Sequence, residues 1–98
     1  MTRKLAISAR AAQEVRRAAA ASGAEGMALR VAAKREADGS VLLGIGFDDE
    51  RTNDDLIETA GVTLLVSHHS RDLLEDMVLD FVDPDFVVVP APPEEDGT

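Results

Sequence analysis

Hydrophobic and polar residues alternate with a period of two over much of this chain, a pattern typical of strands with one buried face. The alternation begins at Met27 and runs to Lys34, with Leu, Val and Ala on one side. It returns over residues 41–47, where every second residue is apolar. Asp38-Gly39, between the two segments, has the composition of a tight turn. The sequence therefore predicts a β-hairpin over residues 27–47.

A helix is predicted before this hairpin. The Ser8 hydroxyl can cap it by accepting a hydrogen bond from a free amide of the first turn. Residues 9–21 are mostly Ala, Arg, Gln and Glu, which favour helix, and Gly23 is a typical residue to end it. Arg10 and Glu14 lie four residues apart, so they share one face of this helix.

The second half of the chain predicts shorter elements. A second hairpin is centred on Ala60-Gly61, and Ser70 is predicted to cap a short helix that extends to residue 77. Asp83-Pro84-Asp85 separates the last two predicted strands, and residues 48–55 predict a polar loop without a core residue. The predicted strands outside the first hairpin are residues 5–7, 56–57, 62–66, 79–81 and 86–89.

These elements predict a mainly β fold with a minor α component. Each strand has one apolar face, so two layers must meet to exclude water. We expect a two-layer β-sandwich of antiparallel hairpins with an N-terminal helix and one short helix. Residues 1–90 are predicted to form one domain, and residues 91–98 a disordered, acidic, proline-rich tail.

The net charge and the lack of long apolar segments bear on whether the chain binds nucleic acids or membranes. The 98 residues carry a formal net charge of −9, which opposes binding to the phosphate backbone of nucleic acids. No apolar run is long enough to span a membrane, and Met1-Thr2-Arg3-Lys4 is not followed by the apolar core of a signal peptide. The sequence predicts a cytoplasmic protein without a nucleic-acid or membrane partner.

The chain contains no cysteine. This excludes a disulfide framework, a thiolate zinc site, an all-cysteine iron–sulfur site and a cysteine nucleophile within the chain.

Several segments are similar to those of one known family. Leu29-Arg30-Val31 and the run from Gly44 to Asp49 resemble its first two strand motifs, and the match between them needs no gap. Asp80-Phe81 and residues 86–90 resemble its closing strands. Over residues 5–90 the chain resembles the HesB/IscA-like A-type iron–sulfur cluster carriers. The resemblance implies the HesB-like fold and the dimers or tetramers in which family members commonly occur.

The residues that would hold a cluster are absent. In the ungapped alignment the family's first ligand cysteine falls at Asp38, and its C-terminal Cys-Gly-Cys pair has no counterpart in residues 92–97. Thiolates hold iron–sulfur clusters, and hard carboxylates are poor substitutes for them. We therefore expect a cysteine-free, degenerate HesB-like protein that holds no cofactor.

Metal binding through other ligands has weak candidates. One of His68 and His69 could join a surface site for zinc or iron with Asp72 or Glu75, although solvated loop histidines are the simpler interpretation. Asp38 stands at the former ligand position, and turn geometry alone explains an Asp before Gly.

Other motifs predict no site. Gly44-Ile45-Gly46 lies inside a predicted strand and is not a phosphate loop; its glycines are predicted to relieve crowding or to mark a bulge. The acidic residues between 48 and 55 lack the spacing of a calcium loop. Ser67 and Ser70 lie near the histidines without a nucleophile elbow, so no residue set predicts an enzyme.

The favoured hypothesis is a non-enzymatic interaction or regulatory protein linked to iron–sulfur metabolism. Its partner is a protein that the sequence does not identify, and a homo-oligomer is one assembly that the resemblance allows. The alternative is a weak metal-binding or iron-delivery protein that uses histidine and carboxylate ligands.

Overall fold

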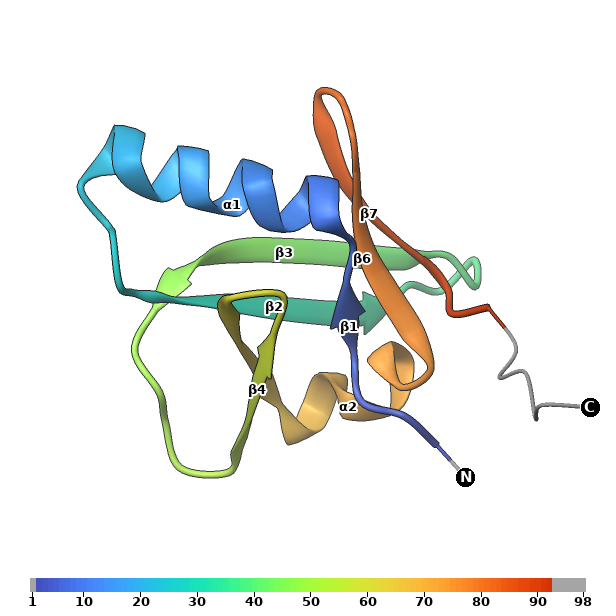
Figure 1. The fold of residues 1–98 in the computed structure, drawn as a ribbon. Coiled ribbons are helices and arrows are strands. Elements are labelled where there is room, and N and C mark those ends of the chain that lie inside the picture. Colours follow the sequence, from blue (N-terminus) through green and yellow to red (C-terminus); the bar gives the residue numbers. More distant parts are fainter. Residues whose placement is uncertain (1, 93–98) are drawn as a thin grey trace, which may run out of the picture.

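A computed structural model describes residues 2–92 of the chain. Within these residues it contains seven strands and two helices, drawn in Figure 1. In chain order they are β1 (Ala6–Ile7), α1 (Ala9–Ser22), β2 (Ala28–Arg35), β3 (Val41–Asp48), β4 (Asp54–Thr59), β5 (Val62–Ser67), α2 (His68–Leu74), β6 (Met77–Val82) and β7 (Asp85–Pro90).

The strands form two sheets, which confirms the predicted fold class. One sheet has the order β1-β6-β7 and the other β3-β2-β5-β4. Both predicted hairpins are present as antiparallel pairs, and the two strands on either side of Asp83-Pro84 form a third antiparallel pair. Two further pairings are parallel, β1 with β6 and β2 with β5, and the sequence did not predict them. These parallel pairings join the hairpins into sheets.

Helix α1 has the predicted ends. The Ser8 hydroxyl accepts a hydrogen bond from the amide of Ala11, and Gly23 adopts a left-handed φ of 72° after the last turn. The small side chains of one helix face are buried, which lets the helix lie close to the strands. Figure 1 shows α1 packed along one side of the four-stranded sheet.

The core lies between α1 and the inner faces of both sheets. Leu64 and Val31 of the central strands are fully buried there, together with Leu79 of the small sheet. Because aromatic residues make up only 3% of the chain, aliphatic side chains fill this core. Its other members are Leu5, Ile7, Ala11, Ala12, Val15, Leu29, Ala33, Val62, Val66 and Leu74.

Three local predictions were wrong. Residues 48–55 are not wholly loop, because Asp48 ends β3 and β4 begins at Asp54. Helix α2 begins at His68 with Ser67 as its N-cap, so Ser70 does not cap the helix, and the histidines are helical rather than in a loop. The helix also ends earlier than predicted, at Leu74.

The explanation of the β3 glycines was also wrong. The β2–β3 register is continuous from Ala28 opposite Asp48 to Arg35 opposite Val41, with no bulge. A Cβ built on Gly46 would meet nothing within 4 Å, and one on Gly44 would only reach Ala32 at 4.0 Å. Neither glycine therefore relieves crowding.

Asp76 holds both ends of the described chain to the domain. Its carboxylate accepts a hydrogen bond of 2.7 Å from the Arg3 amide, and its own amide donates to the Arg3 carbonyl. The Asp76 carbonyl accepts from Ala91, and Pro92 accepts from the Arg3 side chain. Residues 91 and 92 of the predicted disordered tail are therefore hydrogen-bonded, and residues 93–98 lie outside the described part.

Candidate functional site

Arg30 is a charged residue in the middle of β2, between two buried apolar residues, Leu29 and Val31. Because side chains alternate along a strand, Arg30 lies on the face of the sheet opposite to the core. Its side chain is only 16% exposed, and its cross-strand neighbour on β3 is Gly46. A guanidinium at such a depth requires anionic partners, which the β3–β4 connection supplies.

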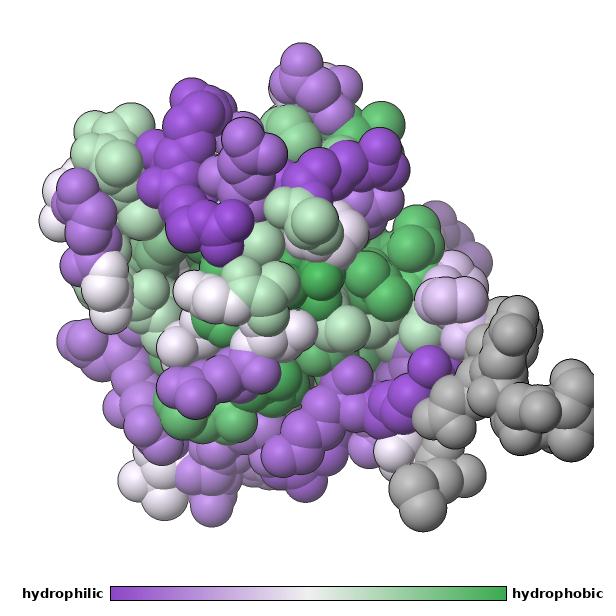
Figure 2. All heavy atoms as spheres, viewed as in Figure 1, coloured by the Kyte–Doolittle hydropathy of each residue, from purple (hydrophilic) through white to green (hydrophobic). Residues whose placement is uncertain are grey.

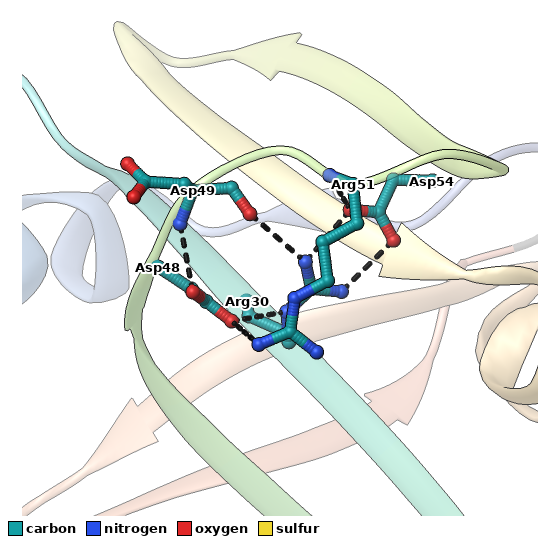
Figure 3. A network of polar contacts seen from close by, with 5 residues as sticks. All are labelled: Arg30, Asp48, Asp49, Arg51 and Asp54. Atoms are coloured by element: carbon teal, nitrogen blue, oxygen red, sulfur yellow. Dashed lines mark hydrogen bonds and ion pairs between the residues drawn. The ribbon is translucent and has the colours of Figure 1, made fainter.

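The guanidinium group donates hydrogen bonds to three residues, Asp48, Asp49 and Asp54, as Figure 3 shows. Its two terminal nitrogens donate to the two carboxylate oxygens of Asp54 at 2.9 and 2.7 Å, which is a bidentate pair. Its Nε donates to Asp48 at 2.8 Å, and Nη2 also donates to the carbonyl of Asp49 at 3.2 Å. Arg30 therefore fastens the connection between β3 and β4 to the outer face of the sheet.

Electrostatics in this cluster favour the charged forms of Arg30, Asp48 and Asp54. The Asp54 side chain is 2% exposed, and hydrogen bonds from Arg30 lower its pKa to about 2. Arg30 also lowers the pKa of Asp48, and these carboxylates raise the pKa of Arg30. Arg51 adds two hydrogen bonds: its backbone amide donates to Asp54 at 2.7 Å, and its guanidinium donates to Asp48 at 2.9 Å. No carboxylate oxygen of Asp54 is left without a donor.

Asp38 lies at the tip of the β2–β3 hairpin and is exposed. Its carboxylate accepts hydrogen bonds from the amide and hydroxyl of Ser40, at 2.9 and 2.6 Å, and these bonds lower its pKa. The following Gly39 has a φ of 89°, which an L side chain rarely adopts. The structure thus gives Asp38 the turn role that its sequence context predicted.

His68 and His69 begin helix α2, and their ring centres lie 4.1 Å apart. His68 lines a shallow depression together with the carboxylates of Asp54 and Asp55. Both carboxylates are bonded to arginines, Asp54 to Arg30 and Asp55 to Arg71 at 2.8 Å. Among residues 2–92 no group of three or more His, Asp or Glu side chains is placed to hold a metal ion. The structure does not bring Asp38 together with the two histidines.

A second fully paired carboxylate fixes α1 to the small sheet. Asp80 of β6 accepts a two-nitrogen fork from Arg10 at 2.7 and 2.6 Å and a bond from the Ser8 hydroxyl at 2.7 Å. Arg10 and then Ser8 hold the pKa of Asp80 well below its usual range. Arg10 therefore pairs with Asp80 rather than with Glu14, which it faces along the helix, and Glu14 bonds to Arg17 instead.

The sequence contains a signal for the Arg30 cluster that hydrophobic periodicity alone does not reveal. A lone arginine between Leu29 and Val31, followed by an acidic segment at residues 48–55, indicates a buried cation in need of partners. The pairing itself joins residues 18 and 24 positions apart, and such a separation cannot be inferred from local pattern.

No protein-family model matches this chain, and no curated protein matches it in sequence. The fold does have a solved counterpart. The crystal structure of Escherichia coli SufA, described as involved in the biosynthesis of iron–sulfur clusters, superposes with a TM-score of 0.70. The alignment covers 89% of this chain and 80% of that chain at 20% sequence identity. The HesB/IscA-like resemblance is thereby confirmed as a resemblance of fold.

The side chains of this chain include no thiolate ligand for an iron–sulfur cluster. An iron–sulfur cluster is held by thiolates, and the chain has none. Asp38, which the family resemblance predicts at a ligand position, is a turn aspartate whose carboxylate accepts a hydrogen bond from the Ser40 amide. Among residues 2–92 no helix is long and apolar enough to cross a membrane.

Proposed function

We propose that this protein is a cytoplasmic, non-enzymatic member of iron–sulfur metabolism that acts through protein contacts and carries no cluster on its own side chains. Its fold supports the link, because SufA, whose structure it resembles, is involved in the biosynthesis of iron–sulfur clusters. Ligand chemistry supports the second part, because oxygen donors do not replace thiolates in these clusters.

One observation carries the proposal: the carrier fold is kept while its sulfur donors are gone. The residue at the aligned ligand position, Asp38, has its carboxylate engaged by Ser40. The buried carboxylate of Asp54 is engaged by Arg30. What remains is a stable scaffold whose surface, and not a metal centre, is available for recognition.

Anaerobic reconstitution tests the ligand part. The purified chain is incubated with ferrous iron, sulfide and reductant, desalted, and examined by visible absorption and by iron and sulfide analysis. We expect no stoichiometric chromophore, while a cysteine-containing carrier of the HesB/IscA-like family treated in parallel acquires one. Stoichiometric iron and sulfide on this chain would contradict the proposal.

A transfer assay tests the link to iron–sulfur metabolism. A loaded carrier of that family passes its cluster to an apo-ferredoxin, and the rate is followed with increasing amounts of this protein. We expect the rate to change and then to saturate, as it does when a protein binds a component of the reaction. The heat-unfolded protein is the control, and a rate unchanged at every concentration would contradict the regulatory role.

A further inference from the structure

Strand β3 is an edge strand without the usual protection against pairing with another chain. The four-stranded sheet ends in β3 on one side and in β4 on the other, as Figure 1 shows. Edge strands are commonly protected by charges, prolines, bulges or short length. The other outer strands have these features: β4 contains Asp54, Asp55 and Glu58, β7 contains Asp85 and Pro90, and β1 has two residues.

The free edge of β3 has none of these features. Residues 41–47 contain neither a charged residue nor a proline, and the strand is eight residues long without a bulge. Among the described residues, the backbone groups of 41–47 have hydrogen-bond partners on β2 alone. Leu42 is 60% exposed and Val41 is 41% exposed. This edge presents unpaired amides and carbonyls beside exposed apolar side chains.

The charges at the two ends of the edge differ in sign. Lys34 and Arg35 stand at the turn end of β2 and form no ion pair among the described residues. Asp48 and Asp49 stand at the opposite end of β3. Figure 3 shows the Asp49 carboxylate pointing away from Arg30, which contacts only its carbonyl. An antiparallel strand with the same sequence would bring unlike charges together at both ends.

We propose that β3 pairs with β3 of a second copy of this chain, antiparallel, about a two-fold axis at Ile45. Residues opposite each other in an antiparallel pair point to the same face, so the core face of one copy continues into that of the other. With the axis at Ile45, Leu42 lies opposite Asp48 of the second copy, and Val41 lies opposite its Asp49.

This register lines up Lys34 and Arg35 each with a carboxylate of the second copy, in the direction across the strands. Lys34 is the β2 neighbour of Leu42, and Arg35 is that of Val41. Across the joined strands, Lys34, Leu42 and Asp48 of the second copy therefore lie side by side in one row. Arg35, Val41 and Asp49 of the second copy form the next row, on the opposite face. Strands lie about 4.8 Å apart, so two strand spacings separate the backbones, and long basic side chains can cross that distance.

Neighbouring registers lose this match. An axis at Gly44 places Gly46 of the second copy opposite Leu42, so the Lys34 row ends without a carboxylate. An axis at Gly46 places Asp49 of the second copy opposite Leu43, an apolar residue that packs against the core. It also places Arg51 of the second copy opposite Val41, in line with the like charge of Arg35. Charge and burial together select the axis at Ile45.

Sedimentation equilibrium over a range of protein concentrations tests the proposal. We expect a monomer–dimer equilibrium for the unchanged chain, and a species that stays monomeric at about 0.5 mM would overturn the proposal. Leu42→Glu places a like charge opposite Asp48 and should weaken association about tenfold, whereas Leu42→Lys at the same exposed site should not weaken it. Equal behaviour of the two variants would overturn the register.

A charge exchange tests the contact between copies. Arg35→Glu and Asp49→Arg should each weaken the dimer about fivefold, because each change affects two symmetry-related rows. The double variant should restore the association of the unchanged chain. Within one chain the two positions lie about 25 Å apart along the sheet, so they cannot pair there. A double variant that associates no better than the single ones would overturn the contact. Circular dichroism confirms that each variant is folded.

Discussion

The two ends of β2 are stabilised by different chemistry. Near its start, β2 pairs with β5, and Arg30 binds the two carboxylates of Asp48 and Asp54 above the sheet. Near its end β2 remains paired with β3 on one side, and on the other side helix α2 lies beside it where β5 no longer pairs with it. There the amide of Ala33 donates to the Ser70 hydroxyl at 3.0 Å, and the same hydroxyl contacts the Ala33 carbonyl at 3.3 Å.

The comparison shows how the chain uses its polar residues. One end depends on a charged cluster that is largely hidden from water, and the other on a single buried neutral hydroxyl. In both places the polar groups satisfy each other, and no buried side-chain donor or acceptor among the described residues is left without a partner. Polar groups that stabilise the fold in this way are not free to bind a metal.

The largest expected effect is at the charged end. Replacing Arg30 with methionine keeps the aliphatic stem and removes the guanidinium, so the Asp54 carboxylate is left buried without its main partner. We expect the free energy of unfolding in urea at pH 7 to fall by about 3 kcal/mol. Arg17→Met, which removes an exposed arginine that pairs with Glu14 on helix α1, is the control and should leave it nearly unchanged. Equal losses in the two variants would show that the cluster does not stabilise the fold.

A smaller effect is expected at the neutral end. Ser70→Ala removes the hydroxyl and leaves the Ala33 amide buried without an acceptor, which should cost about 2 kcal/mol in urea unfolding. Ser22→Ala is the control, because the Ser22 hydroxyl is exposed and bonds to a carbonyl of its own helix. Its loss should be less than about 0.5 kcal/mol. A Ser70→Ala protein as stable as the control would refute the role given to this hydroxyl.

The charged end, unlike the neutral one, should respond to pH. Arg30 lowers the pKa of Asp54 from its ordinary value of 3.8 to about 2. A lowered pKa in the folded state contributes stability that is present above the unfolded-state pKa and is lost as pH falls towards 2. The difference in unfolding free energy between the unchanged chain and Arg30→Met should therefore shrink between pH 4 and pH 2. The difference between the unchanged chain and Ser70→Ala should stay constant over that interval.

Sequence predicted the elements whose signals are local. The Ser8 cap, the Gly23 end and the hairpin turns each depend on a few adjacent residues, and the structure confirms them. Ser70 shows why other features were missed. Its partner is 37 residues away, so the local preference of serine for helix N-caps does not predict the long-range contact that decides its role. The parallel pairing of β2 with β5 has the same cause.

In the candidate site, too, the locally determined feature was predicted from the sequence and the long-range one was not. The turn role of Asp38 follows from the Gly39 beside it, and it was predicted. The Arg30 cluster joins two strands and the acidic connection between them, so it became visible only in the folded chain. The family resemblance predicted the fold but could not predict these contacts, because the cysteine ligands that it implies are absent from this chain.

The smallest effect is expected at Asp38, the aligned ligand position. Asp38→Asn keeps an oxygen that can accept from Ser40, so the hairpin turn and the melting temperature should stay nearly unchanged. Titration calorimetry with ferrous iron and with zinc should give the same weak or absent heat for this variant and for the unchanged chain. His68→Ala/His69→Ala, which removes both imidazoles, is the comparison variant for nitrogen ligands. Stoichiometric binding that Asp38→Asn abolishes would mean that Asp38 holds a metal, and that its carboxylate does more than form the turn.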